Sequence, residues 1–317
     1  MTSAVVFAYH NVGARCLRVL RAHGIDVPLV VTHADDPSEE RWFACVADVA
    51  DDLGLAWIAP RDVNEPGVVA RIATLRPDFV FSFYCRQMLA PQLLAIPARG
   101  ALNMHGSLLP RYRGRAPVNW AVLNGERQTG ATLHFMTERP DAGDIVAQQA
   151  VPILPDDTAR EVLDKVTVAA EICLDAVLPA LVAGTAPRLR NDVARGSYCG
   201  ARTPQDGRID WRASAAAIHN LVRAVAPPYP GAFTQLDGVP ARVLRTRVLD
   251  AEAAGGEPLL CVQAIRIEQR HAAGETLALV ARCGGGGTLR IDAIDVDGQR
   301  ATPEAIAERF GRTIALR

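Results

Sequence analysis

Short apolar segments alternate with amphipathic ones through the first half of the chain. Five of them have the length and the β-branched content of buried strands, namely 4–8, 27–32, 55–58, 79–84 and 101–105. Helical patterns fill the gaps between them. In one gap, Ser38 is positioned to cap a helix that Gly54 would end, with apolar residues on one face at Trp42, Phe43, Val46, Val49 and Leu53. Strands that alternate with helices in this way predict a parallel sheet with helices on both faces.

The second half of the chain has a different pattern. Thr158 and Glu161 have the spacing of a capping box, so we predict a long helix that starts there and ends before Gly184. Its inward face is predicted to hold Val162, Val166, Ala169, Ile172 and Leu178. After a short helix at 214–224 come brief strands, separated by glycine-containing turns at 237–238, 255–256 and 284–287. Such a series is typical of a small antiparallel barrel or sandwich.

These patterns predict an α/β protein of two domains. Residues 1–190 are predicted to form a Rossmann-like domain around the parallel sheet, where ligands bind beyond the carboxyl ends of the strands. The polar segment 191–207 is predicted to be a linker. Residues 208–317 are predicted to form a smaller β-barrel-like domain of the OB type.

Composition and charge narrow the classes of function. The chain has 317 residues, 49% of them hydrophobic, which is enough for a sizeable core, and a formal net charge of −1. A nearly neutral chain has no overall basic field for a polyanion, so nucleic acid is not the expected substrate. No uninterrupted apolar run approaches the ~20 residues of a membrane span, and the N-terminus lacks a signal-peptide pattern. We therefore expect a cytoplasmic protein without membrane insertion.

Asn103 and His105 are the first candidates for chemistry. They are two positions apart in a predicted strand, so both side chains project from the same face, and Gly106 and Ser107 end the strand directly afterwards. Two polar side chains on one face of a buried strand are costly unless they are used. A rigid basic turn follows and leads into a helix at Pro117.

Asp141 is a further candidate. A strand predicted at 129–136 is followed by a tight acidic turn at 139–144, from which Asp141 could return to His105. Spacing alone leaves a plainer interpretation open for each residue. An isolated histidine is more often structural, and an aspartate in a glycine-containing turn often serves only the turn. The seven cysteines include no C-x-x-C pair, so no metal site is indicated.

Three groups of residues are similar to the motifs of one enzyme family. Residues 103–110 are Asn-Met-His-Gly-Ser-Leu-Leu-Pro, 113–117 are Arg-Gly-Arg-Ala-Pro and 141–145 are Asp-Ala-Gly-Asp-Ile. Together they resemble the 10-formyltetrahydrofolate-dependent formyltransferases. Residues 222–225 and 229–233 look like the start of that family's C-terminal domain, so the resemblance covers nearly the whole chain.

Within the family, the residues are most similar to those of UDP-4-amino-4-deoxy-L-arabinose formyltransferase, an enzyme of lipid A modification and polymyxin resistance. The similarity lies in 5–10, 81–84, 105–107 and 113–120. The tRNA enzymes of the family typically carry alanine where Gly106 and Arg115 stand. The best-known sugar homologue also has a decarboxylase domain. No second nucleotide-binding pattern follows here, so we expect any decarboxylation to come from another polypeptide.

The resemblance implies three catalytic residues. Asn103 would stabilise an oxyanion, His105 would transfer protons, and Asp141 would orient His105 and raise its pKa. The implied formyl donor is 10-formyltetrahydrofolate, and no metal is implied. The donor contacts that the resemblance implies are Gln87, Met88, Leu89, Arg115, Thr137, Glu138, Arg139, Pro140 and Asp141. Met88 and Leu89 are equally compatible with ordinary core positions.

The implied acceptor is the amine of a UDP-linked amino sugar. Arginines and amides suit a diphosphate and sugar hydroxyls, which makes candidates of Tyr9, Asn11, Arg113 and Asn119. Two alternatives stay open. One is a methionyl-tRNA formyltransferase, which would need a basic surface for tRNA. The other is a binding protein for folate or a nucleotide sugar that keeps the fold without catalysis. The sequence is also compatible with a homo-oligomer.

Overall fold

The computed structural model describes residues 1–35, 41–249, 261–268 and 275–315. The chain forms two compact units. One holds 1–118, 128–152 and 163–201, and the other holds 119–127, 153–162 and 202–317. The bounds predicted from the sequence, 1–190 and 208–317 with a linker at 191–207, stay a prediction.

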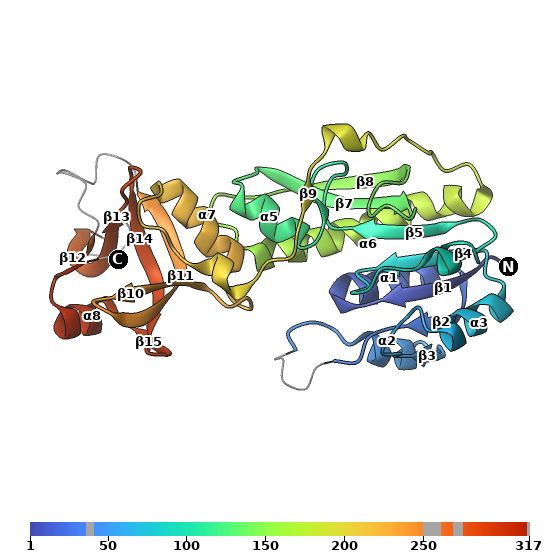
Figure 1. Ribbon diagram of the computed structural model, residues 1–317, viewed down its shortest axis with the longest axis horizontal. Coiled ribbons are helices and arrows are strands. Elements are labelled where there is room, and N and C mark those ends of the chain that lie inside the picture. The colour runs from blue at the N-terminus through green and yellow to red at the C-terminus, as the bar shows by residue number, and fades with distance from the viewer. Residues whose placement is uncertain (36–40, 250–260, 269–274, 316–317) are drawn as a thin grey trace. The chain divides into compact units, whose positions relative to one another are not determined.

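A seven-stranded sheet is the framework of the first unit (Figure 1). Its order is β3-β2-β1-β4-β5-β7-β8. The strands are β1 (Ser3–Ala8), β2 (Asp26–Val31), β3 (Trp57–Ile58), β4 (Phe79–Phe83), β5 (Ala101–His105), β7 (Gln128–Phe135) and β8 (Ile145–Pro152). The first five are parallel, as the sequence predicted, whereas β7 is antiparallel to β5 and β8 to β7. The connection between β7 and β8 is short, so it joins antiparallel neighbours.

Helices connect the strands of this unit in the predicted alternation. They are α1 (His10–Ala22), α2 (Val46–Asp52), α3 (Pro66–Leu75) and α4 (Pro91–Leu94), together with α5 (Pro117–Leu123) and α6 (Ala159–Ala183), each of which has residues in both units. α1 packs against β1 and β4. Ile72 of α3 is fully buried in one apolar core with Val5 and Phe7 of β1. The Rossmann-like fold predicted from the sequence is confirmed.

One helix is shorter than predicted. α2 begins at Val46 and not near Ser38, which lies outside the described residues. Trp42 and Phe43 precede the helix, and the centroids of their rings lie 4.6 and 4.4 Å from that of the His10 imidazole. The apolar pattern at 42–43 therefore reflects packing against the start of α1 rather than the period of a helix.

The long helix α6 begins with the predicted capping box. The N–H of Thr158 donates to Glu161 Oε2 at 2.7 Å, and the N–H of Glu161 donates to Thr158 Oγ1 at 3.3 Å. Four of the five residues predicted to face inward are buried. Ile172 is 50% exposed, because the buried face continues at the next residue, about 100° further around the helix. Gly184, at φ 75°, ends α6 as predicted, and Gly54, at φ 64°, ends α2.

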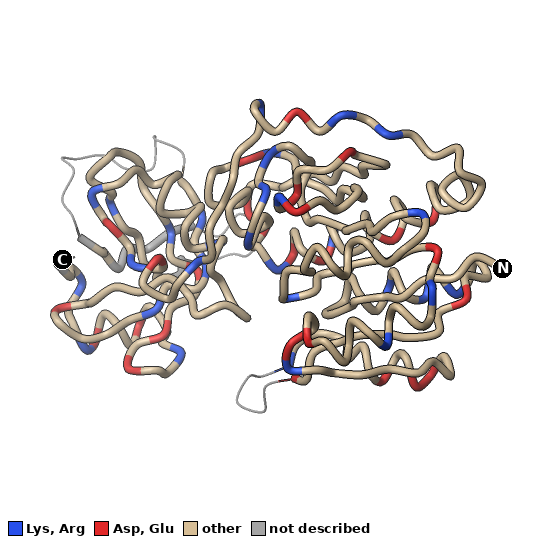
Figure 2. The backbone as a smooth tube through the Cα atoms, turned by 45° about the vertical axis from the view of Figure 1, so that its right-hand side comes forward, with Lys and Arg blue, Asp and Glu red and all other residues tan. Residues whose placement is uncertain are grey.

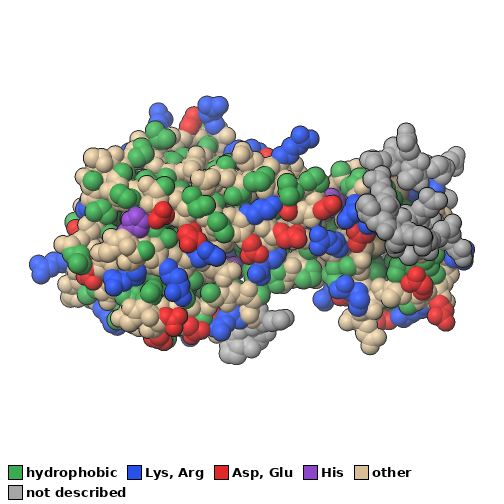
Figure 3. Space-filling model, turned by 180° about the vertical axis from the view of Figure 1, so that it is seen from behind, with side chains coloured by type: hydrophobic (Ala, Val, Ile, Leu, Met, Phe, Trp, Pro, Cys, Tyr) green, Lys and Arg blue, Asp and Glu red, His purple; other side chains and the backbone are tan. Residues whose placement is uncertain are grey.

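By length and composition alone, α6 is apolar enough to span a membrane. Half of its most apolar stretch is buried inside the protein. Its Glu171 pairs with Arg15, and its Asp175 lies 2.8 Å from His23. One buried face and charged partners on the opposite face are typical of the core helix of a globular protein. Hydrophobic and charged side chains are likewise mixed on the face of the molecule in Figure 3.

The second unit contains an antiparallel sheet that curls into a half-barrel (Figure 1). Its order is β10-β11-β14-β13-β12-β16, with β15 beside β14. The strands are β10 (Ala232–Leu236), β11 (Val239–Leu249), β12 (Cys261–Glu268), β13 (Glu275–Arg282), β14 (Thr288–Val296), β15 (Gln299–Ala301) and β16 (Thr313–Ala315). Ile218 and Val222 of α7 (Ala215–Val225) and Ile306 of α8 (Pro303–Phe310) join the buried face of the sheet. The predicted barrel-like domain is confirmed.

Glycine turns separate these strands where the sequence predicted them. Asp237 and Gly238, at φ 47° and 84°, connect β10 to β11. The glycine run at 284–287 connects β13 to β14, and the N–H of Gly284 donates to the carbonyl of Trp211 at 2.8 Å. The turn predicted at 255–256 lies outside the described residues.

Candidate active site

The structure brings Asn103, His105 and Asp141 together on one face of β5. Asn103 and His105 project from the same side of the strand. Asp141 Oδ1 lies 3.5 Å from Asn103 Nδ2 and 3.6 Å from His105 Nδ1. The side chains of His105 and Asp141 are only 7% and 12% exposed, so their charges interact in a largely dry environment.

A tight loop carries Asp141 back to β5. The loop leaves β7 beside the amino end of β5 and closes with a hydrogen bond from the N–H of Phe135 to the carbonyl of Asp144 at 2.9 Å. Gly143 is required, because a Cβ there would lie 2.0 Å from the carbonyl oxygen of Phe135. Asp141 has φ 49°, a left-handed conformation that aspartate tolerates better than most residues. The turn geometry thus serves to aim the carboxylate at the strand.

The basic turn after β5 holds the other oxygen of Asp141. Within this turn, the short strand β6 (Arg113–Gly114) pairs in parallel with β9 (Tyr198–Cys199). The N–H of Gly114 donates to Asp141 Oδ2 at 2.8 Å. Gly114 has φ 93°, and a Cβ here would lie 2.3 Å from the carbonyl oxygen of Cys199, so glycine is required on both counts. Oδ2 is therefore anchored, and Oδ1 faces the histidine and the amide.

One hydrogen bond fixes the tautomer of His105. Its Nε2 lies 2.8 Å from the carbonyl oxygen of Tyr112, and because a carbonyl only accepts, Nε2 carries the proton. In the neutral ring Nδ1 then carries no proton, and its lone pair faces Asp141. The sequence predicted Asp141 as the group that orients this ring. In the structure the hydrogen bond that orients it goes to Tyr112.

The pKa of His105 is lowered from its ordinary value. Burial lowers it most, and the charge of Asp141 raises it by less. Arg113 and His134 lower it further, while the hydrogen bond to Tyr112 raises it. The sequence predicted only the effect of Asp141. The net result is an imidazole that is neutral at neutral pH and able to accept a proton at Nδ1.

His134 is a fourth member of the cluster, which the sequence reasoning missed. It stands opposite Asn103 in the pairing of β5 with β7. Its Nδ1 lies 2.8 Å from the carbonyl oxygen of the next residue and must donate to it, so Nε2 is an acceptor in the neutral ring. Nε2 lies 3.2 Å from Asn103 Nδ2 and 3.4 Å from Asp141 Oδ1. Thr132 and His134, polar and two apart in a buried strand, carry the same signal that singled out Asn103.

These contacts set orientation and charge within the cluster. Only an N–H can face the acceptor nitrogen of His134, so the amide of Asn103 is oriented with Nδ2 toward the site. Burial alone would raise the pKa of Asp141, but a positive charge on His105, a proton on His134 Nε2 and the N–H of Gly114 each lower it, and the net pKa lies well below its usual value. Asp141 is therefore a carboxylate at neutral pH, with the lone pair of His105 beside it.

Both parts of the chain match the models of one protein family. Residues 4–178 match the model of the formyl transferases, and residues 202–310 match that of the formyl transferase C-terminal domain. The chain belongs to the formyl transferase family. The first match covers more than half of the chain and includes the whole cluster on β5 and its loop. The enzyme class predicted from the sequence, a formyltransferase, is confirmed.

Solved structures with the fold of this formyltransferase include sugar N-formyltransferases. One from Helicobacter canadensis, in complex with folinic acid and dTDP-3-aminofucose, is 17% identical with a TM-score of 0.69, and the match covers 95% of this chain and 100% of that one. One from Shewanella sp FDAARGOS_354 is 21% identical with a TM-score of 0.63, over 79% and 99% of the chains. HypX from Aquifex aeolicus, in complex with tetrahydrofolic acid, is 17% identical with a TM-score of 0.62, over 97% and 47%.

The formyltransferase holds the loop predicted to contact the donor in a fixed position. Gln87 accepts from the N–H of Val63 at 2.9 Å and donates to the carbonyl of Arg61 at 2.8 Å. Met88 is 55% exposed, whereas Leu89 is 3% exposed and belongs to the apolar core. Leu89 is thus a core residue and Met88 is not. A fixed loop with an exposed apolar side chain fits a pterin, which needs backbone hydrogen bonds and an apolar surface.

The other residues predicted to contact the donor lie on the two turns that frame the cluster. Arg115 is exposed on the basic turn, and its N–H donates to a carbonyl of β9 at 3.0 Å. The loop that carries Asp141 exposes Thr137, Glu138 and Arg139, and partly exposes Pro140. Both turns also hold Asp141, so these residues lie on the segments around the cluster.

Three of the four residues predicted to contact the sugar nucleotide are engaged within the protein. The contacts are Tyr9 to Asp35 at 3.1 Å, Asn11 to the N–H of Ala44 at 2.8 Å, and Asn119 to the carbonyl of Ala224 at 2.9 Å. Asn119 is buried in the second unit, whereas the other three candidates belong to the first.

Arg113 differs from these three. It is 5% exposed, and its Nε has no hydrogen-bond partner among the described residues. Its guanidinium carbon lies 5.8 Å from the centroid of the Tyr198 ring. A buried donor without a hydrogen-bond partner is costly, so the Nε of this side chain is a group that an anionic ligand would satisfy.

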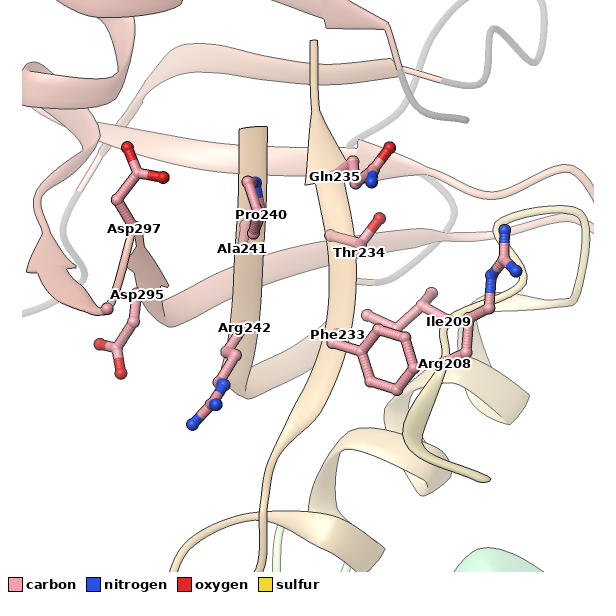
Figure 4. A pocket seen from close by; sticks show the side chains of 11 residues that line it. Arg208, Ile209, Phe233, Thr234, Gln235, Pro240, Ala241, Arg242, Asp295 and Asp297 are labelled. Carbon is pink, nitrogen blue, oxygen red and sulfur yellow. The ribbon is translucent and has the colours of Figure 1, made fainter. Parts of the chain in front are cut away.

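A cavity of about 620 Å³ lies in the second unit, over the strands of its sheet (Figure 4). Its lining includes Phe233 from β10, Arg242 from β11 and Asp295 from β14. None of the residues predicted for the site lines this cavity. The candidate site, the cluster on β5, is therefore separate from this cavity.

Charge and metal ligands give no sign of other chemistry in the part of the chain that the structure describes. Figure 2 shows Lys and Arg interspersed with Asp and Glu along both units. Within the described ranges, no group of three or more His, Cys, Asp or Glu side chains is arranged to hold a metal ion.

Proposed function

We propose that this formyltransferase moves a formyl group from 10-formyltetrahydrofolate to the 4-amine of a UDP-linked amino sugar. The acceptor we favour is UDP-4-amino-4-deoxy-L-arabinose, whose formylation belongs to lipid A modification and polymyxin resistance. The cluster of Asn103, His105 and Asp141, in a chain of this family, is the observation that carries the proposal. The cytoplasm is the compartment we expect for the reaction.

The choice of substrates has two supports. The N-formyltransferase from Helicobacter canadensis, which shares the fold, is in complex with folinic acid and dTDP-3-aminofucose. HypX from Aquifex aeolicus is in complex with tetrahydrofolic acid. Reduced folates and a nucleotide-linked amino sugar are thus ligands of proteins with this fold. Within that class, the resemblance of residues 113–120 favours the UDP-linked arabinose.

His105 is the proton carrier in the proposed reaction. The acceptor nitrogen attacks the formyl carbon, a new C–N bond forms, and the nitrogen must lose a proton. His105 takes this proton at Nδ1, which its hydrogen bond to Tyr112 keeps as a lone pair. It then gives the proton to the folate nitrogen as the bond between that nitrogen and the formyl carbon breaks. The products are a formamide and tetrahydrofolate, and His105 is neutral again.

Asn103 and Asp141 stabilise the charges that this exchange creates. Negative charge grows on the formyl oxygen, and an N–H of Asn103 about 3 Å away would stabilise it. Positive charge grows on His105, and Asp141 Oδ1, 3.6 Å from Nδ1, stabilises that charge. Because Oδ2 is anchored by Gly114, Oδ1 keeps its position while the ring changes charge. His134 supports the same exchange by orienting Asn103.

The two substrates would meet different residues around the cluster. For the donor we propose the loop at 87–89, Arg115 and the turn at 137–141. For the acceptor diphosphate we favour Arg113, because it is buried and its Nε has no hydrogen-bond partner among the described residues. The side chains of Tyr9, Asn11 and Asn119 already have partners in the protein, which weakens their candidacy.

The test is to incubate the protein with 10-formyltetrahydrofolate and a panel of amines, and to measure formylated product by mass spectrometry. The panel holds UDP-4-amino-4-deoxy-L-arabinose, dTDP-3-aminofucose and methionyl-tRNA, with His105→Ala as the inactive control. We expect the UDP-linked sugar to be formylated fastest. Faster formylation of the dTDP-linked sugar or of methionyl-tRNA would overturn the assignment of the acceptor. Folded protein that binds folate and formylates none of a wide range of amines would overturn the reaction and favour the non-catalytic binding role.

A further inference from the structure

We infer that the 191–199 segment, which the sequence predicts to be part of a linker, is a positioning element of the active site. It contacts the basic turn after β5 and also the loop that carries Asp141. The inference rests on the proposed roles of His105 and Asp141. It adds to them that these roles depend on residues remote in sequence.

The segment first holds the basic turn. The N–H of Tyr112 donates to Ser197 Oγ at 2.8 Å, and the N–H of Arg113 donates to the carbonyl of Ser197 at 3.0 Å. The pairing continues where the N–H of Arg115 donates to the carbonyl of Cys199 at 3.0 Å. This turn supplies the carbonyl that orients His105 and the N–H that anchors Asp141 Oδ2. A shift of the turn would therefore move both contacts together.

The same segment holds the loop of Asp141. Asn191 Nδ2 donates to the backbone carbonyl of Asp141 at 3.0 Å, and Asn191 is only 6% exposed. Just before it, Leu189 and Ile145 exchange two backbone hydrogen bonds of 2.8 Å each. Asp141 has a positive φ that needs support from its surroundings. Asn191 supplies part of that support from outside the loop.

Gly196 shows how closely the segment and the turn approach each other. A Cβ at Gly196 would lie 2.0 Å from the carbonyl oxygen of Pro110 and 2.7 Å from its Cβ. Gly196 has φ −102° and ψ −176°, an extended conformation that any residue adopts. Glycine is therefore needed here for the contact and not for the backbone conformation. Gly200, in the same stretch of chain, has no atom within 4 Å of its Cβ position, which makes it a matched control.

The experiment compares Gly196→Ala with Gly200→Ala in the full chain. We expect Gly196→Ala to lower kcat about 10- to 100-fold, because displacing a catalytic group by about 1 Å has a cost of this order. KM for both substrates should rise as well, because Arg113 and Arg115, the proposed acceptor and donor contacts, lie on the same turn. Gly200→Ala should behave like wild type. Circular dichroism and the melting temperature report whether each variant is folded.

A second readout does not depend on which amine is the acceptor. Burial lowers the pKa of His105 and its hydrogen bond to Tyr112 raises it, and both depend on the position of the turn. The titration of the His105 ring, followed by NMR and assigned by its loss in His105→Ala, should therefore shift in Gly196→Ala. This readout stays valid even if the sugar that we favour is wrong.

Three results would overturn the inference. One is a folded Gly196→Ala with wild-type kcat and an unchanged His105 titration. Another is an equal loss of kcat in Gly196→Ala and Gly200→Ala. If Gly196→Ala does not fold, Ser197→Ala and Ser197→Thr replace it, because the first removes and the second keeps the hydroxyl that accepts from the N–H of Tyr112. Ser197→Ala should then lower kcat and Ser197→Thr restore it, and equal rates in the two would be the third contradicting result.

Discussion

Asp141 should act on the reaction mainly through the charge of His105. When His105 is protonated, its Nδ1 and Asp141 Oδ1 are opposite charges 3.6 Å apart. With an effective dielectric constant of about 20, charges at this separation attract by about 4 to 5 kcal/mol. Loss of that attraction corresponds to roughly a 10³-fold lower rate. Asp141→Ala should therefore lower kcat by up to this factor, and Asp141→Asn should restore little of it, since an amide keeps the shape and not the charge.

The double variant tests whether the two residues work as one unit. His105→Ala alone should lower kcat by about 10²- to 10⁴-fold. Once His105 is absent, Asp141 has no imidazolium to stabilise, so His105→Ala/Asp141→Ala should be scarcely slower than His105→Ala. The measurement is kcat with donor and acceptor both saturating. Asp144→Ala, which changes a partly exposed aspartate of the same loop, should stay near the wild-type rate.

One result would refute this reasoning about the pair. If the logarithmic losses of the two single variants simply add in the double variant, Asp141 does not act through His105. The interaction of Asp141 with Nδ1, 3.6 Å away, would then not contribute to catalysis. Asp141 would serve only to hold the loop, through its contacts with Gly114 and Asn191.

Further predictions concern the amide and the pH dependence. Asn103→Ala should lower kcat by about 10²- to 10³-fold with little change in folate binding by calorimetry, because it removes one donor to the developing oxyanion; a variant with unchanged kcat would exclude that role. The value of kcat/KM should fall at acid pH as His105 becomes protonated, with a midpoint below the ordinary value for histidine because burial lowers its pKa. In pH profiles, Asp141→Asn should move this midpoint to lower pH and Arg113→Gln to higher pH, since Asp141 raises and Arg113 lowers the pKa of His105. Shifts in the same direction would contradict the assignment of His105 as the titrating group.

Much of the fold followed from local patterns. The alternation of apolar strands with helices predicted β1, β2, β4 and β5, and the spacing of Thr158 and Glu161 predicted the start of α6. Asn103 and His105 share a face because side chains alternate along any strand. These features depend on neighbours in the sequence, so the sequence alone carries them.

The rest depends on contacts between residues far apart in the chain. Trp42 has helical spacing with α2, yet it packs on His10. The proton of His105 is fixed by a carbonyl on a turn, and that turn is held by a segment that has the composition of a linker. His134 was within reach of the sequence, because it is polar in an alternating buried strand. Its place opposite Asn103 required the pairing of β5 with β7.

The central claim is that this formyltransferase acts on a nucleotide-linked amino sugar. The most direct test is the ratio of kcat/KM for UDP-4-amino-4-deoxy-L-arabinose to that for methionyl-tRNA, with 10-formyltetrahydrofolate as donor. We expect a ratio of at least ~100, which requires only about 2.7 kcal/mol of differential transition-state binding. Comparable efficiencies with the two acceptors would contradict the sugar assignment.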